Sequence, residues 1–532
     1  MTITSFYFIL FVFAVLFIYY IIPPKVRWVV LLIGSYIFYW LNSQLLVLIL
    51  LGTSVITYLF GCILQKNNEK FEAYLRSRNE ISREGKKTIK EKLKRKNRRV
   101  LVVGIALVLF VLLICKYRDF LGELITQLFS WTGTESIVPH IDLLIPLGIS
   151  FYTLQAIAYL VDIYRGKVKA DRNPLKFLLY MSFFPQIIQG PIARHGQLAE
   201  QLYEGHKLEY NNLRFGAQLV VWGFIKKLVI AERIAIPANY IFEHNTEYTG
   251  LMLFLAVLLY GFQIYADFSG GIDIARGVAQ MFGITLEHNF KQPYYASSVE
   301  DFWRRWHITM GSWMKDYIFY PLSLSKAFSR LSKKSRKVFG QYTGKRLPSF
   351  LSMFIVYLCV GFWHGPDWKY VVFGVWNGCF IMISILLEGI YSKTRSLCRI
   401  NEQTFTWKMF RIVRTLVIVS FGRFFTGAKD IDTAVDMFKR TFVNTRDLSF
   451  ITDGSLLKLG LSNANWILLI VTIVILLYVD YKHEHDFSIR KAIAQQHVVF
   501  RWAIYIVAIM VILIFGYYGP EYNPASFIYQ QF

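Results

Sequence analysis

Long apolar runs, separated by short polar segments, recur along the whole 532-residue chain. A run near or above about 18 apolar residues is long enough to cross the hydrocarbon core of a bilayer as a helix. Inside lipid every backbone N–H and C=O needs a partner within the protein, so such runs must be helical. The pattern therefore predicts an all-α, polytopic membrane helix bundle. The charged fraction of 18% agrees with this prediction, because soluble domains have roughly 25%.

Roughly eleven to thirteen hydrophobic segments are expected, and the shorter ones are expected to be re-entrant or interfacial. These segments are drawn from fourteen candidate stretches, residues 5–22, 26–41, 45–64, 100–115, 143–164, 175–188, 213–236, 251–265, 302–322, 350–363, 370–390, 409–425, 466–481 and 498–518. The first segment lacks a basic start and a small-residue cleavage site, which favours a retained span over a signal peptide. Polar segments are too short for a separate soluble domain. We therefore expect one membrane-embedded domain over residues 1–532, with N-terminal spans in 5–120 and C-terminal spans in 464–518.

Positive charge is concentrated in two polar segments. Residues 65–99 carry 14 Lys or Arg and 5 Asp or Glu, and residues 323–348 carry eight basic residues and no acid. Loops of this kind lie on the cytoplasmic side by the positive-inside rule, which places the N-terminus outside and the mixed segment 119–141 on the opposite face. This distribution explains the net charge of +24 without nucleic acid as a partner. Residues 65–99 are either a solvated loop or a surface for lipid headgroups or a partner.

Two of the ten histidines have flanking tryptophans and lie between long apolar segments. His364 lies in Gly361–Trp368, and His307 lies in Asp301–Thr309. An ionisable side chain in an apolar layer is costly and by default marks a functional site. We therefore hypothesise that the two histidines share one buried site. A neutral imidazole can take the proton of an alcohol at neutral pH, as acyl transfer to a hydroxyl requires.

Each histidine also has a structural explanation. An isolated core histidine is usually satisfied by a carbonyl, but Gly361 and Gly365 around His364 would open the helix and allow another group to approach closely. The segment around His307 has the aromatic and charged faces of an interfacial amphipathic helix, which does not itself require a histidine. The residues that could support the site or bind substrate are Trp303, Arg304, Arg305, Trp306, Asp316 and Trp363.

A further polar stretch, Tyr265–Asp273, follows an apolar run. Asp267 and Ser269 could orient a histidine or bind a polar substrate, and they could equally cap a helix at the membrane boundary. His483 and His485 could bind a metal, but no third ligand is near them in the sequence, and the cysteines lack metal-ligand spacing, so no metal and no bound cofactor are predicted.

The stretch DFWRRWHIT at Asp301–Thr309 together with GFWHG at Gly361–Gly365 resembles the membrane-bound O-acyltransferase family, in particular its bacterial branch of alginate O-acetylases and related proteins. The stretches at Gln189–Leu202 and Tyr265–Ala275 are similar to the same branch, and the resemblance covers about residues 146–425. It implies that His364 is the catalytic histidine and that His307 occupies the second active-site position. It also implies a helix bundle around a central tunnel, where a cytoplasmic acyl donor meets a group reached from outside.

Three positions depart from the pattern of that branch. Asn377-Gly378 replaces a second His-Gly, Phe424–Gly427 differs at its last two residues from Phe-Phe-Arg-Ala, and Ser323-Leu324 replaces Gly-Gly. None of these changes touches the two histidines. The three departures therefore leave the expected acyl chemistry intact and bear on which acceptor the protein uses.

The resemblance implies a membrane O-acyltransferase of a bacterial plasma (inner) membrane. It would move acetyl from a cytoplasmic donor, acetyl-CoA, across the membrane for O-acetylation of a cell-envelope or extracellular polysaccharide. The expected partners are an extracytoplasmic acetyltransferase or other polysaccharide-modification proteins, membrane lipids and a carrier of the acyl donor. D-alanyl or another acyl transfer to a wall polymer is one alternative. A transporter or flippase is another, although such folds carry internal inverted repeats and none is visible in the sequence.

Overall fold

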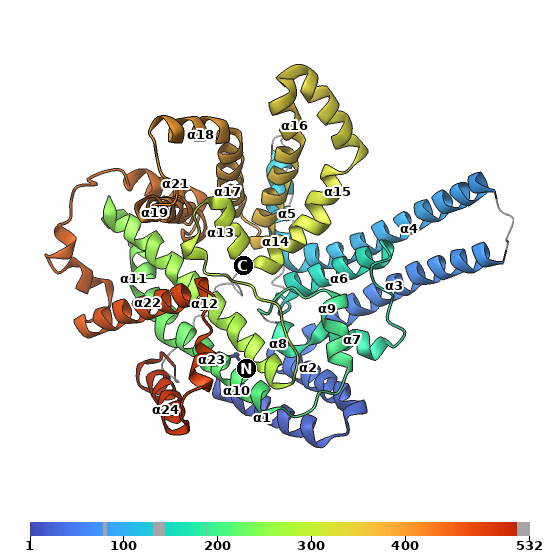
Figure 1. Ribbon diagram of the computed structural model, residues 1–532, viewed down its shortest axis with the longest axis horizontal. Helices are drawn as coiled ribbons and strands as arrows, with labels where there is room; N and C mark the ends of the chain where they lie inside the picture. The colour runs from blue at the N-terminus through green and yellow to red at the C-terminus, as the bar shows by residue number, and fades with distance from the viewer. Residues whose placement is uncertain (78–81, 131–143, 188, 519–532) are drawn as a thin grey trace. The chain divides into compact units, whose positions relative to one another are not determined.

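The structure is a computed structural model that describes residues 1–77, 82–130, 144–187 and 189–518. Within these ranges every regular element is helical, and the one β-type pairing is an isolated bridge between Phe290 and Trp306 (Figure 1). The all-α prediction is confirmed. Residues 131–141 of the expected outer segment and Ile188 of the expected span 175–188 lie outside the described residues.

Seven described stretches are long and apolar enough to cross a membrane, which confirms the polytopic prediction. They are Pro24–Arg76, Glu84–Ser130, Leu251–Met281, Gly344–His364, Trp368–Leu386, Asn463–Glu484 and Val498–Phe515. Two shorter apolar helices, Phe6–Ile21 and Ile149–Tyr164, accompany them. The number is below the expected eleven to thirteen partly because segments such as 175–188 and 302–322 are broken into short helices, which are too short to cross.

One compact unit comprises Met1–Ala217 and Ala275–Glu287. Its helices are α1 (Phe6–Ile21), α2 (Arg27–Ser43), α3 (Val47–Arg76), α4 (Arg83–Leu112), α5 (Arg118–Ser130), α6 (Ile149–Tyr164), α7 (Pro174–Ser182), α8 (Phe184–Ile187) and α9 (His195–Tyr203). Aromatic rings fill its interior: Phe38, Phe177 and Phe184 are fully buried. Tilted ring contacts connect α8 to α2 through Phe38 and to the end of α7 through Phe183.

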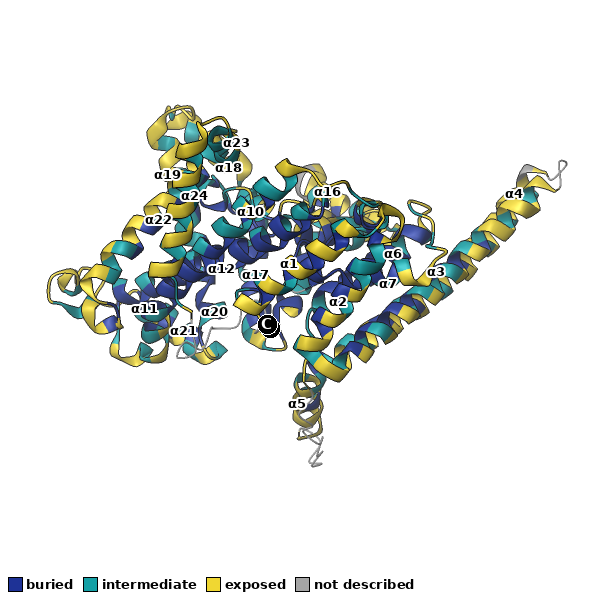
Figure 2. Ribbon diagram, turned by 90° about the horizontal axis from the view of Figure 1, so that it is seen from below, coloured by how far each residue is buried: buried dark blue, intermediate teal, exposed yellow. Residues whose placement is uncertain are grey.

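The basic segment 65–99 is mostly helical, which differs from the expected loop. It continues α3 to Arg76 and begins α4 at Arg83, and most of its side chains are exposed (Figure 2). Lys, Arg and Glu are good helix formers, and extending an existing membrane helix avoids the cost of nucleation. The side-chain amide of Asn67 also donates to the Asn97 side-chain oxygen at 3.0 Å, which ties the two helices together.

The second unit comprises Gln218–Ile274 and His288–Phe532, of which residues after 518 are not described. Helices α10 (Tyr210–Phe224) and α12 (Leu251–Met281) contribute residues to both units. The other main helices of this unit are α11 (Glu232–Glu243), α13 (Val299–Arg305), α14 (Ile308–Met314), α15 (Tyr320–Ser323), α16 (Lys326–His364), α17 (Trp368–Leu386), α18 (Glu388–Leu397), α19 (Phe405–Gly422), α20 (Phe424–Gly427), α21 (Ile431–Arg440), α22 (Asn463–Glu484), α23 (Ile489–Ala494) and α24 (Val498–Phe515). The second basic segment, 323–348, is also largely helical, with a break in α16 at Gly340, where φ is +75°.

Helix α12 continues 16 residues beyond the expected end of its span at Tyr265, to Met281. Gly270 lies inside this helix, at the place where α12 meets the backbone of α10. A Cβ on Gly223 would lie 2.7 Å from the Gly270 carbonyl oxygen. Small residues let membrane helices approach in this way. Because α12 continues to Met281, Asp267 and Ser269 lie inside a helix, and the interpretation that they cap one is wrong.

The charge of the two basic segments predicts the topology. We expect cysteines introduced at the exposed positions of Lys90 and Lys334 in a cysteine-free background to resist a membrane-impermeant thiol reagent in intact cells. Both should react once the cells are permeabilised. Labelling of both positions in intact cells would reverse the assignment.

Candidate active site

His364 is the last residue of α16, directly before the turn into α17. The turn is tight because glycines face the start of α17: a Cβ on Gly361 would lie 2.5 Å from the Tyr370 carbonyl oxygen. Asp367 caps α17 by accepting from the Lys369 N–H at 2.9 Å. His364 is 7% exposed as a residue, and the Phe373 ring lies edge-on to its imidazole at 5.5 Å. The glycines thus allow α17 to approach α16 closely, as expected, but α16 stays helical through Gly361 and opens only after His364.

His307 connects α13 to α14 in an unusual backbone conformation. Its φ is +47°, in the left-handed region that non-glycine residues rarely adopt. Long-range pairing holds it there, since the Ile308 N–H donates to the Asn289 carbonyl at 3.0 Å and Phe290 bridges to Trp306. Such strain persists where the surrounding structure imposes it, and it is concentrated at functional sites.

The side chain of Asn289 fixes the tautomer of His307. Its Oδ1 accepts from the Thr309 N–H at 3.0 Å, from the Thr309 hydroxyl at 2.9 Å, and lies 3.2 Å from His307 Nδ1. A backbone N–H can only donate, so the atom that faces these groups is the amide oxygen. His307 therefore donates from Nδ1 and carries its lone pair on Nε2.

One aromatic cluster contains both imidazoles. The Trp363 ring lies 5.6 Å from the His307 ring and 5.2 Å from the His364 ring, and Phe268 of α12 packs on His307 at 4.9 Å. His307 is 4% exposed and lies outside the candidate spans. Burial, and to a lesser extent the nearby His364, lower the pKa of His307 to about 3. His307 is thus held neutral.

Two tryptophans, Trp303 in α13 and Trp306 directly after it, line the same region. The Trp303 indole N–H donates to the Asn377 side-chain oxygen at 3.1 Å. Asn377 is one of the residues that depart from the branch pattern. Its side chain accepts a hydrogen bond from Trp303, a residue of the candidate site. Trp306 stacks on Phe302 with ring centres 5.5 Å apart. Trp303 also lies 5.9 Å from the Phe373 ring, which contacts His364, and Trp306 lies 5.1 Å from the Phe290 ring, which contacts Phe268.

The two arginines of this segment pair with carboxylates. Arg304 is exposed and pairs with Glu300. Arg305 binds Asp301 at 3.0 Å and Glu484 of α22 at 2.6 Å, which anchors α13. Asp316 is half-buried in the π-helical turn η7, Lys315–Phe319.

Asp267 and Ser269 belong to a buried network of charges beside the cluster. Asp267 pairs with Lys227, which also binds Glu232 at 2.7 Å. The Lys226 ammonium donates to Ser269 at 2.9 Å and binds Asp273 at 2.6 Å. Both lysines lie in η4 (Ile225–Ala231), a π-helical stretch between α10 and α11. Such stretches are rare and frequently mark functional sites.

Sequence reasoning missed Asn289 and Lys227. No local pattern indicates Asn289, because it contacts His307 only through the folding of a segment 18 residues away. Lys227 does carry a signal: it is a charged residue inside the apolar run 213–236, where an ionisable group needs a buried partner. Among the described residues no group of three or more His, Cys, Asp or Glu could hold a metal ion.

We expect Asn289→Ala to impair acyl transfer by at least about tenfold and to destabilise the protein by about 1–3 kcal/mol, because it leaves buried donors unsatisfied. Asn289→Asp, which keeps an acceptor oxygen, should retain more activity. Initial rates over a pH range, with exposed Asn401→Ala as the control, distinguish positioning of His307 from simple loss of fold. Normal rates in folded Asn289→Ala would refute this role.

Comparison with known proteins identifies the family of this chain. The profile of the MBOAT, membrane-bound O-acyltransferase family, matches residues 168–427, a range that contains both histidines. The chain is 30% identical to the probable alginate O-acetylase of Pseudomonas syringae pv. tomato over 80% of this chain and 72% of that protein. It is 31% identical to the probable alginate O-acetylase of Azotobacter vinelandii over 81% and 76%. It is also 31% identical to the peptidoglycan O-acetyltransferase of Helicobacter pylori over 64% of each chain. The chain therefore belongs to the membrane-bound O-acyltransferase family.

Proposed function

We propose that this chain is the membrane component of a polysaccharide O-acetylation system in a bacterial plasma (inner) membrane. It takes an acetyl group from acetyl-CoA on the cytoplasmic side and passes it across the membrane. Its relatives include alginate and peptidoglycan O-acetylating proteins, which supports acetyl as the group and a cell-envelope or extracellular polysaccharide as the final acceptor. The observation that carries the proposal is the buried pair His307 and His364 around Trp363.

The chemistry assigned to His364 is general-base catalysis. Its neutral imidazole takes the proton of an acceptor hydroxyl as the hydroxyl oxygen attacks the thioester carbonyl. A C–O bond forms, the tetrahedral oxyanion collapses, and the C–S bond breaks. The leaving thiolate recovers the proton from the imidazolium, so the ester and the free thiol are produced without a net change in His364.

His307 is assigned a positioning role. Its Nδ1–H is engaged by Asn289, and its Nε2 carries the lone pair, so the neutral ring offers an acceptor and not a donor at Nε2. An acceptor suits the orientation of a hydroxyl group. It does not suit stabilisation of the oxyanion, which needs a hydrogen-bond donor.

The final acceptor requires a second protein in this proposal. A long, charged polysaccharide is poorly suited to entering an apolar helix bundle, because each buried charge is costly. The hydroxyl that receives acetyl from this chain therefore belongs to a serine of a separate extracytoplasmic acetyltransferase. That enzyme then transfers the acetyl group to the polymer.

Reconstitution tests this relay. With this chain in vesicles, labelled acetyl-CoA on the cytoplasmic face and polymer on the other, we expect labelled polymer only when the second protein is added. Efficient labelling of the polymer without it would remove the need for a relay. A parallel assay of acetyl-CoA uptake separates acyl transfer from transport, since a transporter would move the intact donor and leave its thioester unbroken.

A further inference from the structure

The loop between α6 and α7, residues 165–173, presents a cationic surface. Its basic residues Arg165, Lys167, Lys169 and Arg172 are all exposed. The loop contains one acidic residue, Asp171, and its side chain is only 14% exposed. The carboxylate that would neutralise the loop is therefore largely withdrawn from the exposed basic surface.

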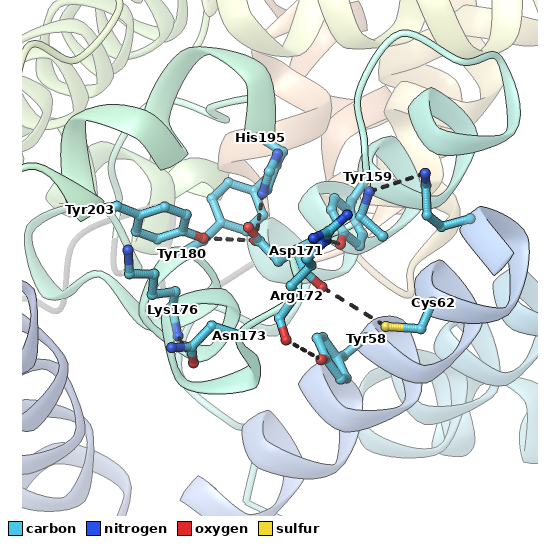
Figure 3. Close-up of polar contacts among 12 residues, drawn as sticks. Tyr58, Cys62, Tyr159, Asp171, Arg172, Asn173, Lys176, Tyr180, His195 and Tyr203 are labelled. Atoms are coloured by element: carbon cyan, nitrogen blue, oxygen red, sulfur yellow. Dashed lines mark hydrogen bonds and ion pairs between the residues drawn. The ribbon is translucent and has the colours of Figure 1, made fainter. Parts of the chain in front are cut away.

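A clamp holds this carboxylate in place. Asp171 Oδ2 lies 2.7 Å from His195 Nε2 and accepts from the Tyr203 hydroxyl at 2.8 Å (Figure 3). The His195 ring packs against Tyr159 and Tyr180, with ring centres 4.9 and 5.0 Å apart. Together these contacts engage the Asp171 carboxylate with groups of α9.

The loop backbone is also fixed. The Asp171 N–H donates to the Tyr159 hydroxyl at 3.0 Å, and the Tyr58 hydroxyl donates to the Arg172 carbonyl at 3.1 Å. The Asn173 side chain caps α7 by accepting from the Leu175 N–H at 2.9 Å. A ligand that binds here does not have to order the backbone, and avoiding that cost raises affinity.

A fifth cation borders the loop. The Lys176 ammonium lies 5.1 Å from the ring centre of Tyr203 and 5.7 Å from that of Trp28. Cation–π contacts of this kind restrict a lysine that would otherwise move freely. Through Tyr203, Lys176 is connected to the same clamp that holds Asp171.

We propose that loop 165–173 is a phosphate-binding site. Arg and Lys side chains on a fixed scaffold form strong charge-assisted hydrogen bonds with phosphate oxygens. The contact of Tyr58 with Arg172 places the loop beside α3, which continues into basic segment 65–99, predicted to be cytoplasmic. The phosphate can belong to a soluble donor such as a CoA thioester, a source that rests on the proposed function, or to a lipid headgroup.

The test measures binding without acyl transfer. Protein in zwitterionic nanodiscs is titrated with 3′,5′-ADP, the phosphate-bearing part of CoA, by calorimetry. A second arm measures phosphatidylglycerol retained by the purified protein, by mass spectrometry. Lys167→Gln with Lys169→Gln removes two loop cations, and Lys90→Gln with Lys92→Gln removes the same charge from exposed positions of α4.

We expect the loop variant to weaken 3′,5′-ADP binding by about tenfold or more, since each charge-assisted hydrogen bond is strong, and the α4 variant by less than about twofold. Loss of phosphatidylglycerol alone, confined to the loop variant, would also support the site and would identify lipid as the source. Equal losses in both variants, or none in either, would overturn the proposal.

His195→Ala tests the clamp itself, because it keeps all four cations and frees the Asp171 carboxylate to turn toward them. It should weaken 3′,5′-ADP binding as well, and wild-type affinity in the folded variant would contradict the role of the clamp. If His195→Ala does not fold, the variant Lys167→Gln with Lys169→Gln still tests the phosphate-binding site, because both replaced lysines are exposed. Binding by His364→Ala should match the wild type, so failure of the proposed acyl chemistry is distinguishable from failure of this site.

Discussion

Replacement of His364 by alanine should lower acetyl transfer by about 10²–10⁴-fold, the range that a general acid–base group contributes. The effect should appear mainly in kcat, because the imidazole acts on the proton that moves in the transition state. The fold should survive, since His364 ends α16 at the turn, and the close contact between α16 and α17 is made by backbone at Gly361. The measurement is the single-turnover rate of labelled acetyl transfer with purified protein in vesicles and the second protein of the relay present as acceptor.

The matched control is His485→Ala, an exposed histidine at the end of α22. It should transfer acetyl at the wild-type rate. Retention of near-normal activity in purified His364→Ala would end the proposed mechanism. A loss in His364→Ala that is accompanied by aggregation on a sizing column would mean that the fold was lost, and His364→Gln would then serve as the less disruptive replacement.

Lys227→Met should destabilise the fold more strongly than His364→Ala or Asn289→Ala does. The lysine side chain is 3% exposed and compensates two carboxylates, those of Asp267 and Glu232, whose side chains are each 2% exposed. Removing one partner of a buried ion pair costs about 3–5 kcal/mol, because it leaves an uncompensated charge. In this network two carboxylates lose their shared cation. We expect a large fall in the melting temperature of the detergent-purified protein, or no folded protein at all.

A rescue variant separates the charge effect from a packing effect. Adding Asp267→Asn and Glu232→Gln to Lys227→Met removes the two uncompensated charges and should recover part of the lost stability. Lys408→Met, at an exposed position of α19, provides the control and should melt as the wild type does. Equal melting temperatures of Lys227→Met and wild type would show that the buried network does not stabilise the fold.

The candidate site illustrates what sequence reasoning can reach. His307 and His364 could be singled out because a histidine between apolar runs is costly, and because their tryptophan-flanked motifs resemble one family. Trp363 could be named with them because it is adjacent in the chain. Asn289 could not, since its contact with His307 depends on the pairing of residues 289–291 with residues 305–309, which no local pattern encodes.

The basic segments show that charge patterning does not predict secondary structure. Their charge could be read directly, but residues 65–99 and 323–348 were expected to be loops and are largely helical. Charge patterning reports the preferred side of the membrane, whereas helix formation there follows from the adjacent membrane helices that the polar residues extend. Asp171 shows the same gap between charge and structure. In the sequence it is one acid among basic residues, whereas in the structure His195 and Tyr203 bind its carboxylate.

The sequence by itself determined that the chain is a polytopic membrane helix bundle, because hydrophobic length is a property of local composition. It also singled out His307 and His364 as candidates, because an ionisable group between apolar runs is costly. Only the tertiary structure decided which partner each polar side chain takes: Asn289 for His307, Lys227 for Asp267, and His195 for Asp171. These partners come from segments distant in the chain. A buried polar group must be satisfied by whatever the fold brings within hydrogen-bonding distance, so its partner is a property of packing and not of neighbouring residues.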